Sequence, residues 1–354
     1  MRRVVRAPMV SSVTTHEPSN RQSATGSLTG RALAPVAWPV RRLVAALDGL
    51  VVTLDDPSPS NTGALRLRQG SALLLIVFAG LLLVQSALHG KLSPIGFILG
   101  MLAFALYTNR GGRFLRDWVP VALAFVAYGV TAHAVPDLGL GIHFTPQIDA
   151  EQVLGLGSLP TIWLQEHLYH GTTGVLEVFS IAMYISHFLA PLLLAFLIWA
   201  FWQGRGFRDL LYGILIVSLL GEITFVLAPT APPWLAADHG LIPPVHHVIK
   251  QGLYDLGLTD LAARKDEPGS YNIVAALPSL HAAWPVMGLL VIRKHRLPRW
   301  LFVSQALLLL GVVFAIVYTG EHYFVDAVVG CAYAFGAWWL LHAILRTGRR
   351  HQNP

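Results

Sequence analysis

The chain has 354 residues, of which 54% are hydrophobic and only 12% are charged, and its net charge is +6. Soluble domains carry about twice this share of charged residues, so the composition favours a membrane-spanning protein over a soluble one. A single cysteine, Cys331, excludes an intrachain disulfide and a thiolate metal cluster.

The first 69 residues differ in kind from the rest. They hold nine arginines and no lysine, with many Ser, Thr and Pro residues. Because they contain no continuous apolar core, they do not resemble a secretory signal. We expect residues 1–69 to be a cytoplasmic, largely disordered basic tail, in which 41–56 is a candidate interfacial helix. A targeting or regulatory role is the alternative.

Eight apolar runs follow, and the second and sixth are short. They lie near residues 70–88, 93–108, 118–135, 174–202, 209–228, 278–293, 300–318 and 322–345. Crossing about 30 Å of hydrocarbon takes about 20 apolar residues. Their apolarity is continuous rather than alternating, which excludes a membrane barrel. The predicted fold class is therefore an all-α integral membrane protein with about eight transmembrane helices.

The basic residues predict the orientation. If the amino terminus is inside, 21 of the 25 Lys and Arg residues fall in cytoplasmic pieces. Only Lys91, Lys250, Arg264 and Lys265 fall on the outer face. Both termini are then cytoplasmic. The net positive charge reflects the membrane topology, and no nucleic acid partner is expected. The Arg-rich, Lys-poor composition is typical of high-GC bacteria, so we expect the plasma (inner) membrane and a periplasmic outer face.

Two long segments without a spanning run, 136–173 and 229–277, are predicted on that outer face. Loops of this length are usually functional or disordered. Their Trp and Leu content favours lids or gates over a reaction site.

Two histidines stand at matching places. His281 begins one apolar run and His322 begins another, and a third run lies between them. Crossing a membrane twice returns the chain to its starting face, so both imidazoles are expected at one water–lipid boundary. Each histidine taken alone is more often an ordinary interfacial residue, but their joint placement favours catalysis. The polar residues His133, Glu222 and His342 within apolar runs are individually ambiguous.

These residues suit phosphoryl transfer through a phosphohistidine. Asp326 follows His322 by four positions, so on a helix the two share a face. A carboxylate that accepts one imidazole proton leaves the other nitrogen free to attack phosphorus. His281 would donate a proton to the leaving oxygen. Ser279 is predicted to cap a helix start, which favours a phosphate. No metal and no cofactor is required.

The sequence resembles the type 2 phosphatidic acid phosphatase superfamily, and more closely its inositol phosphorylceramide synthase branch. Four stretches carry the resemblance: Pro-Ser-Leu-His (278–281), Gly-Glu-His-Tyr-Phe-Val-Asp (320–326), Ala-Pro-Thr-Ala-Pro-Pro (228–233), and Tyr-Ile-Ser-His-Phe (184–188) with Pro191. It covers roughly residues 118–345.

The resemblance implies a six-helix catalytic membrane domain at 118–345, two accessory transmembrane helices at 70–117 and a cytoplasmic tail at 346–354. It assigns His322 as nucleophile, Asp326 as its orienting partner, His281 as acid and Ser279 as a ligand of the phosphoryl oxygens. The matching stretches further predict a set of substrate-binding residues: Thr230, Pro232, Pro233, Tyr184 and His187.

The sequence also departs from the family pattern. The classical phosphatases carry basic signatures, including a Ser-Arg pair before the last histidine, whereas Ala315 and Ile316 are apolar here. Trp234 stands where many relatives have Arg. Arg264 and Lys265 are the remaining candidates to meet the phosphate charge, or else they form a solvated loop pair.

Three functions follow from these patterns. The first is a phosphotransferase that moves a phosphoryl-alcohol head group, of the inositol phosphate type, from a membrane phospholipid to a hydroxyl acceptor. The second is a lipid or polyprenyl phosphate phosphatase, for which water is the acceptor. The third is a non-catalytic transporter or scaffold. The weak basic signature favours the first, because a diester carries less charge than a monoester. The sequence predicts no oligomeric state.

Overall fold

The computed structural model of the chain describes residues 94–108, 110–134, 141–154, 157–202, 205–263 and 272–350. Within these ranges every regular element is a helix, which confirms the all-helical class. The predicted tail 1–69, the predicted span 70–88 and the pair Arg264 and Lys265 lie outside the described residues.

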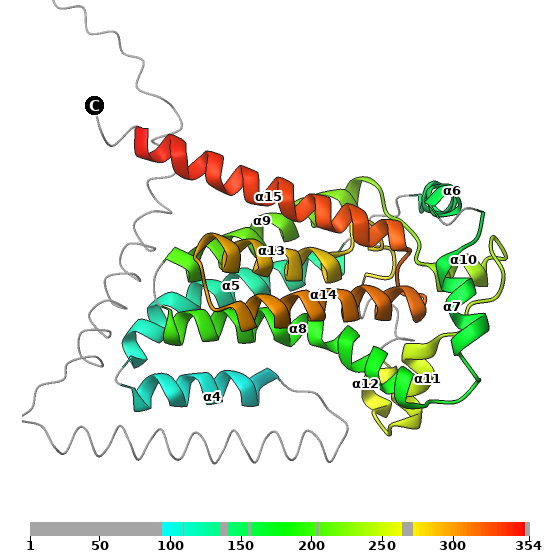
Figure 1. Cartoon of the computed structure of the whole chain (residues 1–354), viewed down its shortest axis with the longest axis horizontal. Coiled ribbons are helices and arrows are strands. Elements are labelled where there is room, and N and C mark those ends of the chain that lie inside the picture. The colour runs from blue at the N-terminus through cyan, green and yellow to red at the C-terminus, as the bar shows by residue number, and fades with distance from the viewer. Residues whose placement is uncertain are drawn as a thin grey trace, which may run out of the picture.

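In the described part of the chain, seven long helices are packed together as a bundle (Figure 1). They are α4 (Pro94–Tyr107), α5 (Gly111–Ala134), α8 (Val175–Phe201), α9 (Arg205–Leu227), α13 (Leu280–Lys294), α14 (Arg299–Tyr318) and α15 (Phe324–Arg350). They occur where the apolar runs from residue 93 onward predict helices.

Four helices in the described part of the chain are long and apolar enough to cross a membrane. These segments are Val175–Phe201, Gly206–Leu227, Arg299–Tyr318 and Phe324–Arg346. Several such helices in one chain are the pattern of a multi-pass membrane protein. The total of about eight spans stays a prediction.

Helix α13 lies at the centre of the bundle. It contacts α8, α9, α14 and α15, and ten of its 15 residues are buried. Its Trp284 donates a hydrogen bond to the Ser218 hydroxyl of α9 at 3.1 Å, so this buried polar contact is satisfied. A helix enclosed on all sides gives its first residues a fixed position.

Among the described residues, five short helices gather at one end of the bundle (Figure 1). They are α6 (Thr145–Leu154), α7 (Pro160–Leu168), α10 (Pro233–Asp238), α11 (Val248–Asp255) and α12 (Thr259–Ala263). They belong to the two segments predicted as lids or gates, which are joined because Thr230 forms isolated bridges with both His143 and Ala275. We call this the capped end of the bundle, and the opposite end, where Lys294 and Arg299 lie, the basic end.

Candidate active site

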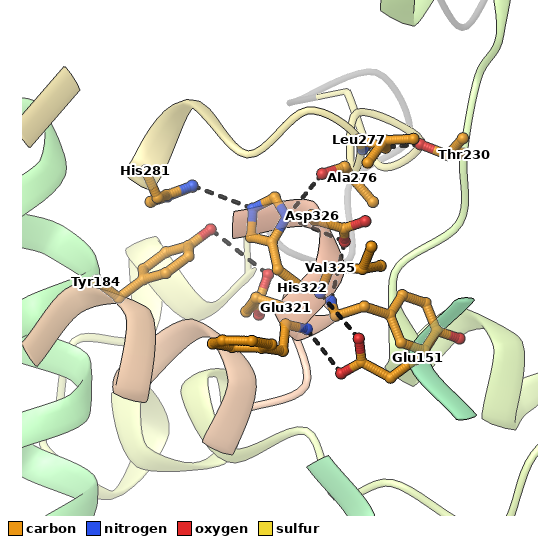
Figure 2. Close-up of polar contacts among 12 residues, drawn as sticks. Glu151, Tyr184, Thr230, Ala276, Leu277, His281, Glu321, His322, Val325 and Asp326 are labelled. Atoms are coloured by element: carbon orange, nitrogen blue, oxygen red, sulfur yellow. Dashed lines mark hydrogen bonds and ion pairs between the residues drawn. The ribbon is translucent and has the colours of Figure 1, made fainter. Parts of the chain in front are cut away.

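The two histidines singled out from the sequence meet at the capped end. His281 is the second residue of α13, and His322 lies in the turn between α14 and α15. His322 Nε2 lies 3.1 Å from His281 Nδ1, and the ring centroids are 5.1 Å apart. Figure 2 shows this contact as a dashed line between the two rings, which meet edge to face. Residues 41 positions apart therefore form one polar unit.

A backbone carbonyl determines which nitrogen of His322 carries the proton. His322 Nδ1 lies 2.8 Å from the carbonyl oxygen of Ala276, which can only accept a hydrogen bond. In the neutral ring, Nδ1 is therefore the donor and Nε2 carries the lone pair. His281 Nδ1–H then donates to that lone pair. The sequence did not predict this carbonyl contact.

Asp326 also faces His322, in a different local geometry from the one expected. Its Oδ2 lies 3.5 Å from His322 Nδ1, farther than the Ala276 carbonyl. Helix α15 begins at Phe324, so His322 precedes the helix and does not share a helical face with Asp326. The two meet because Asp326 turns back to accept the backbone N–H of Tyr323 at 2.9 Å, as the third residue of a helix does in a capping box.

The turn before α15 is fixed by backbone contacts. The N–H groups of Glu321 and His322 both donate to the Ile316 carbonyl, each at 3.0 Å. Gly320 has a φ of +75°, a conformation that glycine adopts without strain. A Cβ at Gly320 would also lie 2.6 Å from Val245 Cγ1. The glycine therefore permits the turn that places His322.

Thr230 holds the loop that supplies the Ala276 carbonyl. Its hydroxyl oxygen accepts the N–H of Leu277 at 2.8 Å, and the N–H of Ala276 donates to the Thr230 carbonyl at 3.3 Å. Thr230, which the sequence predicted to bind substrate, therefore supports His322 indirectly by holding the Ala276 carbonyl in place. Pro232 and Pro233 are buried where α10 begins, and the structure gives them no hydrogen bond or ring contact with either imidazole.

Two predicted residues of α8 reach the imidazole pair. The Tyr184 ring stacks on His281 with centroids 4.9 Å apart, and its hydroxyl donates to Glu321 Oε2 at 3.5 Å. The His187 ring lies 4.1 Å from that of His281 and stacks on Trp284 at 4.2 Å. Packing from two sides thus limits the motion of His281.

Ser279 occupies the predicted cap position of α13, but its side chain makes no capping hydrogen bond. Its Oγ is buried without a hydrogen-bond partner among the described residues. Its backbone N–H donates to the Asp326 carbonyl at 3.0 Å, which ties the start of α13 to the start of α15. Gly330 of α15 makes this approach possible, because a Cβ there would lie 2.1 Å from the Ser279 carbonyl oxygen.

Glu151 of α6 is a residue of the site that the sequence did not predict. Its Oε1 accepts the N–H of Phe324 and its Oε2 that of Val325, each at 2.8 Å (Figure 2). A carboxylate at a helix start is favoured by the free N–H groups and the dipole there. Burial nevertheless raises the pKa of the Glu151 carboxyl. One sequence signal pointed to it, because Glu151 is an acidic residue in the segment 136–173, which contains no Lys or Arg.

As far as the structure describes them, the remaining charged and titratable groups near the imidazole pair form no metal-binding cluster and include no Lys or Arg in contact with His322 or Asp326. Burial raises the pKa of the Tyr323 hydroxyl, and the carboxylates of Asp326 and Glu151 act in the same direction. Within the described ranges, no group of three or more His, Cys, Asp and Glu side chains could hold a metal ion. The contacts of His322 and Asp326 in this part of the chain include no Lys or Arg side chain.

The sequence of this chain matches a known family over the same region. The model of the PAP2 superfamily matches residues 148–340, which is more than half of the chain. The chain belongs to the PAP2 superfamily. The matched residues include the imidazole pair, Asp326 and Glu151, and the resemblance seen in the sequence motifs is confirmed.

Two relatives in this superfamily have named activities. The phosphoinositol dihydroceramide synthase of Bacteroides thetaiotaomicron is 27% identical over 172 residues, which are 46% of this chain and 55% of the relative. The inositol phosphorylceramide synthase of Candida albicans is 28% identical over 265 residues, which are 68% of this chain and 55% of the relative. The chain thus spans about half the length of the curated relatives it matches. No solved structure matches it.

Proposed function

We propose that this PAP2 superfamily protein is a membrane lipid phosphotransferase that uses His322 as its nucleophile. The observation that carries the proposal is the contact of His322 Nε2 with His281 Nδ1 at 3.1 Å, with His322 Nδ1 engaged by a carbonyl. A phosphoryl group entering between the rings takes the place of that hydrogen bond. The names of the two relatives support head-group transfer as the overall reaction.

In the first step, the lone pair of His322 Nε2 attacks the phosphorus of a phospholipid diester. An N–P bond forms while the bond from phosphorus to the diacylglycerol oxygen breaks, and that oxygen keeps the bonding electron pair. His281 enters this step as an imidazolium, gives its Nδ1 proton to the departing oxygen and keeps the proton on Nε2, so its ring becomes neutral. Asp326 and the Ala276 carbonyl stabilise the positive charge that develops on the His322 ring.

In the second step, a hydroxyl of the acceptor loses its proton to His281 and attacks the phosphorus. The N–P bond breaks and returns the electron pair to His322 Nε2, so both histidines regain their starting protonation states. The Ser279 Oγ, which is buried without a partner among the described residues, is a ligand for a phosphoryl oxygen in both steps.

The charges around the imidazoles support a phosphodiester rather than a phosphomonoester donor. Glu321, Asp326 and Glu151 are carboxyl groups close to the pair. Each negative charge disfavours a second one nearby, and a diester carries one charge where a monoester carries up to two. The Glu321 carboxylate and the Tyr184 hydroxyl also offer hydrogen-bond partners to a polyhydroxylated head group such as inositol phosphate.

The proposed site faces the outside of the plasma (inner) membrane, with both termini in the cytoplasm. The capped end holds the imidazoles, whereas Arg208, Lys294 and Arg299 lie at the basic end. Lys and Arg are enriched on the cytoplasmic side of membrane proteins, which supports this orientation. In this arrangement the segments of the capped end act as lids over the donor lipid.

An assay with three donors tests the proposal. Purified protein in detergent receives labelled phosphatidylinositol with ceramide, phosphatidic acid, or undecaprenyl diphosphate, with and without EDTA. We expect transfer of the inositol phosphate head group to ceramide at the same rate in both conditions. Release of inorganic phosphate from the other two donors without any transfer identifies a phosphatase instead. Absence of turnover on all three contradicts enzymatic function.

Variants of the histidines test the mechanism in the same assay. His322→Ala and His281→Ala should each abolish turnover while leaving the fold intact. His170→Ala, an exposed histidine of the capped end, is the control and should keep the full rate. A near-normal rate in His322→Ala would contradict the assignment of the nucleophile.

A further inference from the structure

A second polar cluster lies at the basic end of the bundle, away from the imidazole pair. Its centre is Asp209 of α9, whose side chain is only 7% exposed. Asp209 Oδ2 accepts hydrogen bonds from Lys294 Nζ at 2.7 Å and from His295 Nε2 at 2.9 Å. The buried carboxylate is therefore engaged from two sides, and it fixes the position of a lysine at the end of α13.

Helix α15 holds the same lysine from another side. His342 Nδ1 lies 2.7 Å from the Trp338 carbonyl, so in the neutral ring it donates there and Nε2 accepts. Lys294 Nζ contacts this Nε2 and lies 5.2 Å from the centroid of the Trp338 ring. Three helices thus hold one ammonium group in a defined place.

A cavity of about 850 Å³ opens beside this ammonium group. Its lining includes Arg208 and Arg346, which are both exposed, and it includes Tyr212 and Leu345. With the histidines neutral, the three cations and one carboxylate of the lining leave two net positive charges. Neither arginine has a carboxylate partner among the residues that the structure describes.

The cavity is separate from the imidazole site. From His281 to Lys294 the chain rises by 13 helical residues, which corresponds to about 20 Å along α13. From Asp326 to His342 the rise along α15 is about 24 Å. A molecule bound at the basic end therefore does not occupy the proposed catalytic position.

We propose that this cavity binds the phosphate group of an anionic phospholipid. Its volume is within the range of small-molecule sites, about 300–1,000 Å³. Arginine side chains bind phosphate oxygens in pairs, and a fixed ammonium adds a point charge. Basic pockets between membrane helices bind lipid head groups at the membrane boundary.

The apolar part of the lining distinguishes a lipid from free phosphate. Tyr212 is 51% exposed and Leu345 is 37% exposed, and both line the same cavity as the cations. They lie on α9 and α15, which are long and apolar enough to cross a membrane. A glycerol backbone and the first carbons of an acyl chain fit against such side chains, whereas inorganic phosphate has no apolar part.

A titration with a defined lipid tests this site. The unfolding temperature of the full-length protein in detergent is followed against dioctanoyl phosphatidylglycerol, dioctanoyl phosphatidylcholine or inorganic phosphate. We expect stabilisation by phosphatidylglycerol, since a ligand of the folded state raises its stability. Phosphatidylcholine and phosphate at equal concentration should give no shift. An equal shift with phosphatidylcholine contradicts charge recognition, and an equal shift with phosphate contradicts a lipid ligand.

Variants assign the binding to this cavity rather than to the imidazole site. Arg208→Ala should raise the apparent Kd for phosphatidylglycerol about fivefold, and the double variant with Arg346→Ala about 25-fold. Arg299→Ala removes an exposed arginine at the same end of the bundle outside the cavity and should leave the Kd unchanged. All of these side chains are exposed, so folding is preserved. An unchanged Kd in the double variant overturns the proposal.

Discussion

The Glu151 carboxylate accepts the backbone N–H of Val325 at 2.8 Å, one residue before Asp326. Helix α6 is thereby bonded to the start of α15, because the second carboxylate oxygen binds the N–H of Phe324. The order of the His322 turn thus depends on a side chain 171 positions earlier in the sequence, a separation given by the residue numbers.

Glu151→Gln should lower both stability and rate. The amide keeps one acceptor oxygen, so one buried N–H group loses its partner, at about 1–3 kcal/mol of unfolding free energy. A small displacement of the proposed nucleophile should reduce kcat about tenfold or more. Thermal unfolding and head-group transfer are the measurements. Asp149→Asn, an exposed change on the same helix, should affect neither. Equal behaviour of the two variants would contradict a positioning role.

The stability contributed by Glu151 should depend on pH with a defined sign. Burial raises the pKa of its carboxyl in the folded state above the unfolded value of about 4.3. The folded state then binds the proton more tightly, so this contribution is full below about pH 4 and is lost as pH rises through the folded pKa. As the pH rises from 4 to 8, the unfolding temperature of the wild type should fall relative to that of Glu151→Gln. A gap that grows in favour of the wild type would contradict the raised pKa.

Thr230→Val should reduce kcat and leave KM nearly unchanged. The substitution removes the acceptor of the Leu277 N–H and loosens the loop that presents the Ala276 carbonyl to His322. Thr230→Ser keeps the hydroxyl and should keep most of the rate. Steady-state kinetics of both variants are the measurement. A large increase in KM with unchanged kcat would instead support the substrate-binding role predicted from the sequence.

Asp326→Asn should lower the rate by about 100-fold, less than the roughly 10⁴-fold loss that follows when a catalytic histidine is left in the wrong tautomer. The Ala276 carbonyl lies closer to His322 Nδ1 than Asp326 does, so it preserves the tautomer in the variant. The loss comes from the missing negative charge. Single-turnover kinetics measure it, and an unchanged rate would contradict a role for the carboxylate.

The sequence predicted the elements that depend on local patterns. Continuous apolar runs located the long helices from residue 93 onward, because burial in lipid or in a bundle demands apolar residues throughout. The spacing of the runs also predicted that His281 and His322 would lie at one end of the bundle, and their contact at 3.1 Å agrees with that expectation.

The contacts of Glu151 and Ala276 could not be predicted in this way. A backbone carbonyl carries no side-chain signature, and a carboxylate that binds N–H groups of a distant helix has no fixed spacing from it. The helical face shared by His322 and Asp326 was predicted wrongly for a related reason. The helix starts two residues after His322, and the capping contact of Asp326 with Tyr323 brings the carboxylate back toward the imidazole.

Gly330→Ala should separate the two helices that carry the proposed catalytic residues. A Cβ at position 330 would lie 2.1 Å from the Ser279 carbonyl oxygen, which belongs to rigid backbone, so α13 and α15 must move apart. Overpacking of this kind typically costs about 1–3 kcal/mol, and the shift also lengthens the distance from His281 to His322.

Gly336→Ala is the matched control, since nothing lies within 4 Å of its Cβ position on the same helix. It should keep the rate and raise stability by up to about 1 kcal/mol. Thermal unfolding and transfer rates of both variants decide the matter, and a Gly330→Ala protein with normal activity would show that the close approach of the helices is not required.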